Sequence, residues 1–423
     1  MASSTTDVVI IGGGVIGTAV AYYLARRGVR ATLLEKGHMA SGSSGACDGL
    51  VLLQSKKPGI HLRLAMESRT LFDRLMEDLP VSIEYRRGGG MVVIETEEEF
   101  RAMEHHVQEQ RDTGLEVTLL DNAASRRIEP ELSKSLAGAA YSSLDGQVNP
   151  IALTRGFALA ARALGARIQS HTEVKGIRMQ GGRVTGVETD QGLFPAAVVV
   201  NAAGVYAPQI GEMVGITVPI RPRRGQLLAT AAVKPMVKGC FISARYIAAK
   251  HNPELAKGKG EGIAIEQTES GNLLLGSTRE FVGFDRRTTV EGLRGIACST
   301  MAVLPALSGL NVIRSFAGLR PYTPDGLPIL GPVQAVDGFM MAAGHEGDGI
   351  ALSPITGELI AQVIAEGRTK IPLEPFRLER FESSHDRAGR PLKQDRADEN
   401  RDDPQRRCKD RAGSDPWLKT RNG

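Results

Sequence analysis

The sequence predicts a mixed α/β fold, and two observations lead to it. Near the start, a β-branched run at residues 7–11 is followed by glycines at 12–17, a helical pattern at 18–27 and an apolar strand at 31–34, which together form a β–α–β unit. Segments of the same kind recur at residues 150–200 and 338–366, and strand-rich stretches separate them. We therefore expect one domain assembled from three separated α/β segments, with a second domain inserted between them.

Length and composition are those of an ordinary globular protein. The chain has 423 residues, 42% hydrophobic and 24% charged, with a formal charge of +4 and a high glycine count of 49. These values argue against disordered, collagen-like and membrane-spanning classes. The sequence has no stripe of basic residues with interleaved aromatic residues, so we expect no nucleic-acid partner. The four cysteines form no CxxC pair, so we expect no metal site and a cytoplasmic protein.

The other elements follow from periodicity and from helix and turn signals. We expect helices at residues 58–79, 97–111, 150–165, 290–304 and 350–366, and strands at 91–95, 183–187, 196–200 and 338–343. Residues 382–423 are polar, rich in Arg and Asp and almost free of aliphatic side chains, so we expect a disordered tail. The single tryptophan, Trp417, lies in that tail.

The first glycine turn predicts a dinucleotide site. Gly12, Gly14 and Gly17 have the GxGxxG spacing between a strand and a helix. In such a turn the first glycine allows the bend, the second lets the backbone approach a pyrophosphate, and the third lets the helix pack on the strand. Glu35 ends the next strand, where a carboxylate accepts the ribose hydroxyls and disfavours NADP. NAD and FAD share this pattern, so the turn alone leaves both open.

Two further glycine turns favour FAD. Residues 40–49 form a small, hydroxyl-rich loop between a core strand and a helix, which can bind a second phosphate and lie against a flavin ring. Residues 343–349 again place glycines between a strand and a helix, whose N-terminus can stabilise the negative charge of a reduced flavin. His345 lies in this turn, as a structural residue or as part of the pocket.

With these motifs in order, the sequence resembles the D-amino-acid-oxidase-like FAD-dependent oxidoreductases, in the glycine oxidase and sarcosine oxidase branch. The likeness covers about residues 7–381 and rests on the 12–17 turn with Glu35, on Ser43 and Ser44, and on segments 199–204, 317–328 and 344–349. Segments 321–325 and 344–349 look most like β subunits of heteromeric sarcosine oxidase, opine oxidase and hydroxyproline dehydrogenase.

The resemblance implies a Rossmann-like FAD-binding domain of residues 1–80, 150–215 and 325–381, with an inserted substrate domain of residues 81–149 and 216–324 that carries an antiparallel or mixed sheet. It implies non-covalent FAD, because the loop at 41–49 has no histidine to tether the flavin, and Cys47 is expected to be a packing residue. The expected contacts to FAD are Gly12, Gly13, Gly14, Gly17, Glu35, Lys36, Ser43, Ser44, Asp48, Gly49, Leu50, Val174, Gly204, Gly344, His345, Gly347, Asp348, Gly349 and Ile350.

Arg320 is the residue that we expect to bind the substrate. A planar guanidinium clamps a carboxylate through two hydrogen bonds, and the arginine of this motif does so in the glycine oxidase branch. The alternative is a turn salt bridge to Asp325. Tyr246, Tyr322 and His345 complete the candidate catalytic set. A second pocket arginine of glycine oxidase falls at Gly347, which argues against glycine as the substrate.

The resemblance implies FAD-dependent oxidation of a small amino or imino acid by hydride transfer from Cα to flavin N5. Candidate substrates are secondary amines or D-amino acids such as proline, hydroxyproline, sarcosine or an opine. The likeness to β subunits implies an α-type redox subunit as a possible partner. Two alternatives stay open: a stand-alone oxidase that makes hydrogen peroxide, and a non-catalytic FAD-binding subunit.

Overall fold

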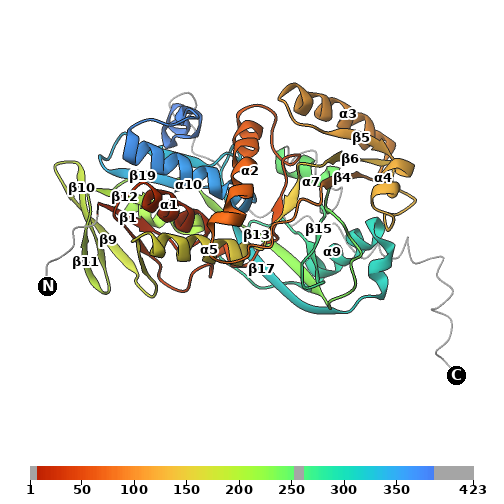
Figure 1. Ribbon diagram of the computed structural model, residues 1–423, viewed down its shortest axis with the longest axis horizontal. Helices are drawn as coiled ribbons and strands as arrows, with labels where there is room; N and C mark the ends of the chain where they lie inside the picture. Colours follow the sequence, from red (N-terminus) through yellow and green to blue (C-terminus); the bar gives the residue numbers. More distant parts are fainter. Residues whose placement is uncertain (1–6, 252–261, 385–423) are drawn as a thin grey trace.

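The computed structural model describes residues 7–251 and 262–384 of the chain. Figure 1 shows two sheets side by side along the long axis, each with helices packed on it. The tail expected at residues 382–423, with Trp417, lies outside the described residues from position 385 onward. Residues 382–384 end a short 3₁₀ helix, Leu378–Ser384.

The first sheet is mainly parallel and is built from three parts of the chain. Its strands run in the order β18 (Ile329–Pro332), β19 (Phe339–Ala343), β12 (Val198–Asn201), β1 (Val8–Ile11), β2 (Ala31–Leu34) and β8 (Arg167–Gln169). β18 is antiparallel to β19, and the other neighbours are parallel. All four residues of β1 are buried, as a strand covered on both faces requires.

Helices cover one face of this sheet and a small sheet covers the other. α1 (Val15–Arg26) contacts α5 (Pro150–Ala163) and α10 (Gly349–Glu366), and α10 contacts α2 (Ile60–Asp78). On the opposite face lie the antiparallel strands β9 (Val174–Gln180), β10 (Arg183–Thr189) and β11 (Gly192–Pro195), whose buried valines share a core with β1 and β12. This arrangement buries both faces of the parallel sheet.

The second sheet is mixed and lies beside the first. Its strands run in the order β17 (Val312–Tyr322), β13 (Arg221–Thr230), β16 (Leu273–Gly276), β15 (Ala264–Gln267), β14 (Cys240–Ser243), β4 (Gly90–Ile94), β6 (Gly138–Ser142) and β5 (Thr118–Asp121). Its core is shared with α9 (Val290–Val303), and α3 (Glu97–Asp112) and α4 (Asn122–Ile128) pack near its far end. In Figure 1 the long pair β13 and β17 lies between the two halves of the molecule.

The structure confirms the mixed α/β fold and most of the expected elements to within a few residues. α1 starts at Val15, three positions before the expected helix, because the glycine turn ends at Gly14 in the N-cap position. Helix α7 (Ala244–His251) and strands β9 and β11 were not expected from the sequence. The two-domain boundaries stay a prediction.

The glycine turn joins β1 to α1 by close packing. Gly12 has a φ of +116°, in the region that favours glycine, and a Cβ at Gly17 would lie 1.9 Å from the Gly12 carbonyl oxygen. The helix therefore starts directly against the end of its strand. β12 and β19 run parallel to β1 and end at the same edge, where a ligand site is expected in such sheets.

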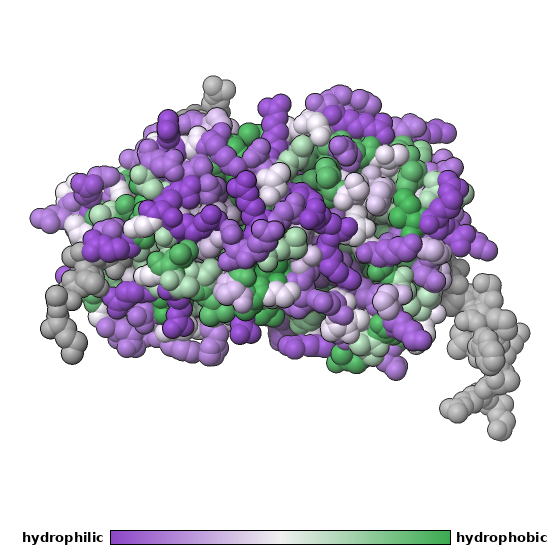
Figure 2. All heavy atoms as spheres, in the orientation of Figure 1, coloured by the Kyte–Doolittle hydropathy of each residue, from purple (hydrophilic) through white to green (hydrophobic). Residues whose placement is uncertain are grey.

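The described surface is mostly polar on the face seen in Figure 2, with apolar residues scattered between charged ones. Across residues 7–251 and 262–384, every helix is too short or too polar to cross a lipid bilayer.

Candidate active site

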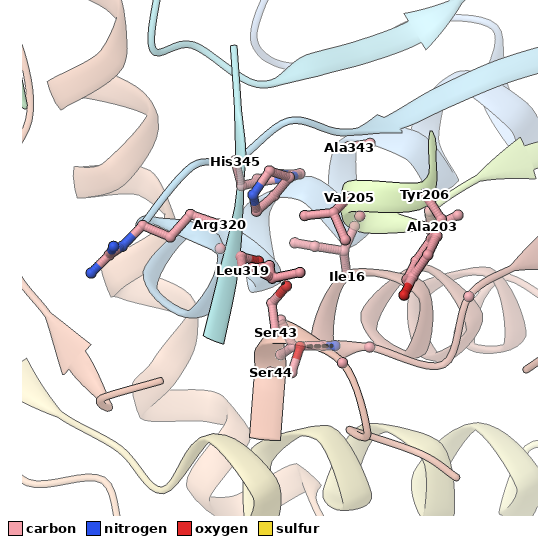
Figure 3. A pocket seen from close by; sticks show the side chains of 18 of the residues that line it. Ile16, Ser43, Ser44, Ala203, Val205, Tyr206, Leu319, Arg320, Ala343 and His345 are labelled. Atoms are coloured by element: carbon pink, nitrogen blue, oxygen red, sulfur yellow. Dashed lines mark hydrogen bonds between the residues drawn. The ribbon is translucent and has the colours of Figure 1, made fainter. Parts of the chain in front are cut away.

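A cavity of about 450 Å³ lies at the carboxyl edge of the parallel sheet. Its walls come from the turns after β1, β2, β12 and β19, from the loop at residues 41–50, and from β13 and β17 of the second sheet. In Figure 3, Arg320 lies at one end of the cavity view, Tyr206 at the other, and His345 and Ser43 between them. The cavity is thus long and joins the nucleotide-type turn to the second sheet.

Glu35 organises the first turn. Its carboxylate accepts hydrogen bonds from the backbone N–H groups of Gly13 and Gly37, each 2.7 Å long. Gly12, Gly14 and Glu35 line the cavity. Gly13 is turned toward Glu35 and Met39, and a Cβ there would lie 2.8 Å from both side chains. The carboxylate therefore holds two turns together at the place where the ribose of a dinucleotide is expected.

Two serines attach the loop at residues 41–50 to the rest of the site. Ser44 Oγ accepts a hydrogen bond from the Val15 N–H at the start of α1, 3.0 Å long, as drawn in Figure 3. Ser43 Oγ donates to the Leu319 carbonyl of β17. The loop thus bridges the N-terminus of α1 and the second sheet. Cys47 lines the cavity, and burial raises the pKa of its thiol well above the usual value.

The third turn brings the N-terminus of α10 to the cavity. Gly344 has a φ of +78°, and a Cβ there would lie 2.6 Å from Thr323 Cγ2. His345 is buried, and its Nε2 lies 3.0 Å from Thr356 Oγ1. Glu346 also lines the cavity and forms a buried ion pair with Arg223. Gly349 and Ile350, the first residues of α10, complete this wall.

Arg320 lies on β17, and its guanidinium is anchored to Ser277 and Thr278. Nη1 donates to the Thr278 carbonyl at 2.9 Å, and Nη2 donates to Ser277 Oγ at 2.6 Å. The alternative of a salt bridge to Asp325 is wrong, because Arg380 pairs with that carboxylate at 2.8 Å. Two of the five N–H groups of Arg320 are used in these bonds, so others are left for a ligand.

Most of the residues expected at the site line this cavity. They are Gly12, Gly14, Glu35, Lys36, Ser43, Ser44, Asp48, Leu50, Val174, Gly204, Tyr246, Arg320, Gly344, His345, Gly347, Gly349 and Ile350. Gly13, Gly17, Gly49, Tyr322 and Asp348 are not among the lining residues.

The residues outside the cavity have other partners. Gly49 donates its N–H to Glu266 Oε1 at 2.9 Å. The Tyr322 ring packs on Phe281, and the guanidinium carbon of Arg223 lies 4.7 Å from the centre of the Tyr322 ring. Asp348 forms a buried ion pair with Lys56, 2.8 Å long. These side chains lie behind the site, and the structure places Tyr322 and Asp348 away from the direct contact that the sequence suggested.

The cavity walls fit a flavin dinucleotide. Three glycine turns present backbone to it, and a Cβ at Gly14 would lie 3.1 Å from Ser44 Oγ, so side chains there would narrow the channel. One end carries Glu35 and Lys36, and the ammonium of Lys36 lies 3.5 Å from the centre of the Tyr206 ring. The other end carries the N-terminus of α10, whose free N–H groups suit an anionic ring edge.

Comparison with known proteins decides the family. A model of the family described as FAD dependent oxidoreductase matches residues 7–363. The chain belongs to this family. The cofactor of the family is FAD, and the cavity walls fit it. Both findings confirm the FAD that the three glycine turns predicted.

Relatives and solved structures agree with the family. The chain is 34% identical to a glycine oxidase of Geobacillus kaustophilus, over 88% of this chain and 97% of that protein. It is 32% identical to hydrogen cyanide synthase subunit HcnC of Pseudomonas protegens, over 89% and 96%. The crystal structure of an L-proline dehydrogenase from P. horikoshii superposes with a TM-score of 0.82 at 28% identity, covering 90% of this chain and 98% of that chain.

Several charged residues near the site of this oxidoreductase were not expected from the sequence. Glu266 on β15 is buried behind Asp48, and burial together with the Asp48 charge raises the pKa of its carboxyl. Burial also raises the pKa of Asp48. No motif surrounds Lys56, Arg223 or Arg279, so the local sequence gives no sign of their role. Glu266 could have been noticed as the one charged residue in an apolar strand.

His345 is expected to make the stability of this enzyme depend on pH. Burial lowers the pKa of His345 from 6.5 to about 3, so between these values the unfolded chain binds more protons than the folded one. The free energy of unfolding therefore falls as pH is lowered through this window, by up to about 1.4 kcal/mol per pH unit. His345→Gln should flatten this slope in urea unfolding between pH 4 and 6. Equal slopes in both proteins would contradict the assignment.

Proposed function

We propose that this FAD-dependent oxidoreductase oxidises a small amino or imino acid whose carboxylate is bound by Arg320. The observation that carries the proposal is the placement of the guanidinium: Arg320 lines the same cavity as the three glycine turns, with N–H groups left for a ligand. Relatives named as glycine oxidase, L-proline dehydrogenase and sarcosine oxidase subunit beta support this substrate class.

Arg320 would act by binding and orientation. A guanidinium already held by Thr278 and Ser277 loses little freedom when a carboxylate docks, so the substrate is positioned at low entropic cost. Tyr246 is buried beside it, and burial raises the pKa of its hydroxyl, so this group stays a neutral hydrogen-bond donor. Bound FAD supplies the acceptor of the two electrons taken from the substrate.

Proton removal does not require a dedicated base when the amine binds in its neutral form. Asp48 is one of the carboxyl groups that line the cavity, and burial raises the pKa of its carboxyl. The tight loops and buried walls would keep bulk water from the reacting atoms.

We further propose that the chain works as a catalytic β-type subunit with an α-type redox partner. The 28% identity to sarcosine oxidase subunit beta of Rhizobium meliloti, over 89% of this chain, supports this role. The similarity to glycine oxidase supports the second candidate, a stand-alone oxidase.

Anaerobic mixing of the purified holoprotein with a panel of amines tests the activity. Sarcosine, D-proline, L-proline and an opine are expected to include at least one compound that bleaches the flavin absorbance within seconds. Bleaching by none of them would contradict the proposal and favour a non-catalytic FAD-binding subunit. Hydrogen peroxide formed in air by the single chain would favour the oxidase; turnover only with an artificial acceptor or a co-purified subunit would favour the dehydrogenase complex.

A further inference from the structure

Arg279 is a buried guanidinium without a hydrogen-bond partner among the described residues. Its side chain is 10% exposed, and Nε, Nη1 and Nη2 are all buried and unpaired in hydrogen bonding. A guanidinium carries five N–H donors, and leaving them unpaired away from water is costly. An anionic ligand that pairs with Arg279 in the working enzyme would offset this cost.

Arg279 lies directly behind one wall of the cavity. Its guanidinium carbon is 4.1 Å from the centre of the Tyr246 ring, and its Nη1 is 4.0 Å from Glu346 Oε1. Both Tyr246 and Glu346 line the cavity. One aromatic ring and one carboxylate therefore lie between the Arg279 guanidinium and the cavity.

Gly347 leaves room for a ligand group on the cavity side of this wall. A Cβ at Gly347 would lie 3.6 Å from Arg320 Nε and 3.6 Å from Tyr246 Oη, at ordinary contact distance from both. The position thus opens a space bordered by Arg320 and Tyr246. A side chain at position 347 would occupy this space, and glycine leaves it free for a ligand group.

The charges around this space favour a second anion. Glu346 is already paired with Arg223, and the carboxylate of a monocarboxylic substrate would pair with Arg320. Burial raises the pKa of the Asp48 carboxyl, and the charges of Arg320 and Arg279 act in the opposite direction. Among the described residues, no carboxylate accepts a hydrogen bond from the Arg279 guanidinium.

We propose that the substrate is an amino or imino acid with two carboxylates, the first bound by Arg320 and the second by Arg279 through the space over Gly347. This inference rests on the proposed function and names its substrate class. Because the Tyr246 ring covers one face of the guanidinium, binding includes a turn of that ring away from Arg279. Substrate selection then comes from leaving Arg279 unpaired when the second carboxylate is missing.

Sarcosine and iminodiacetate form a matched pair for the test, since they differ only in the second carboxylate. In the wild-type holoenzyme, kcat/KM is expected to be at least tenfold higher for iminodiacetate. Arg279→Leu is expected to bring the ratio of the two kcat/KM values close to one, and Arg279→Lys to lower it less, because the charge stays and the planar fork is lost. Arg314→Leu, an exposed arginine on β17, is the control and should leave the ratio unchanged.

Binding provides a readout besides turnover. Malonate should perturb the visible flavin spectrum at a concentration at least 30-fold lower than acetate, and Arg279→Leu should remove most of that difference. A wild-type enzyme that prefers sarcosine, with both ratios unchanged by Arg279→Leu, would overturn this inference and leave the proposed function standing. Tight, Arg279-dependent malonate binding without bleaching by any amine would support the anion site and overturn the proposed function. If no amine bleaches the flavin and malonate does not perturb its spectrum, both the proposed function and the two-carboxylate substrate would be overturned.

Discussion

Replacing Arg320 with leucine is expected to lower kcat/KM for amino-acid substrates by about 10³-fold, while the protein keeps its FAD. Removing one partner of a buried, hydrogen-bonded charge pair costs about 2–5 kcal/mol, and about 1.4 kcal/mol corresponds to a factor of ten. The contacts of Arg320 in the structure are to Thr278 and Ser277, away from the glycine turn at residues 12–17, so cofactor binding should survive.

Steady-state kinetics and flavin absorbance measure the two parts of this prediction. Arg320→Lys is the second variant; it keeps the charge but loses the bidentate geometry, so we expect about a tenfold to 100-fold loss. For an amine without a carboxylate, kcat/KM should change little from the wild-type value in either variant. Unchanged kcat/KM for carboxylate substrates in Arg320→Leu would remove Arg320 from the binding site.

Replacing Lys56 with methionine is expected to destabilise the protein by about 3–5 kcal/mol. The Lys56 and Asp348 side chains are 2% and 4% exposed and pair at 2.8 Å, so methionine would remove the lysine charge beside a buried carboxylate. Lys56 also donates to the Leu52 carbonyl at 2.6 Å and to Ser55 Oγ at 2.8 Å. His61 Nε2 lies 3.3 Å from Asp348 Oδ2 and is also buried.

The effect should extend to the cofactor, because Asp348 directly precedes α10 and the turn at residues 344–349 lines the cavity. We expect urea unfolding at lower concentration and weaker retention of FAD on dialysis. Adding Asp348→Asn to Lys56→Met should recover part of the stability, since the buried negative charge is then removed together with the lysine charge. Lys370→Met is the matched control: its pair with Glu67 is 37% and 50% exposed, so its loss should cost less than about 1 kcal/mol.

If Lys56→Met were no less stable than Lys370→Met, the buried pair would not hold the turn. If the double variant were less stable than Lys56→Met, the cost would come from lost packing around the lysine stem, and not from an unpaired carboxylate.

The glycine turns were predictable because their chemistry is local. A positive φ at Gly12 and Gly344, and a close approach at Gly17, are requirements of one short stretch of chain, and they appear directly as glycine in the sequence. Glu35 was predictable for the same reason, since it ends the strand that follows the first helix. These residues were sufficient to predict the mixed α/β fold and the FAD site.

The substrate end of the cavity was not predictable in this way. Tyr322 follows Arg320 by two positions in β17, yet it packs on Phe281 outside the cavity. The environment of Arg279 depends on Tyr246 from α7, a helix without a clear sequence signal, and on Glu346 from a turn 67 positions further along the chain. Side-chain neighbours of this kind follow from strand register and from the meeting of distant segments.

The sequence by itself determined the glycine turns of the cofactor site and most of the helices and strands, because each depends on a short stretch of chain, and the resemblance to a known family indicated Arg320 as the carboxylate ligand. Only the tertiary structure decided which charges are paired: Glu346 with Arg223, Asp348 with Lys56, Asp325 with Arg380, and Arg279 with no hydrogen-bond partner among the described residues. The reason is physical, since the energy of a buried charge depends on its solvent exposure and nearest counter-charge, and both are set by residues far away in the chain.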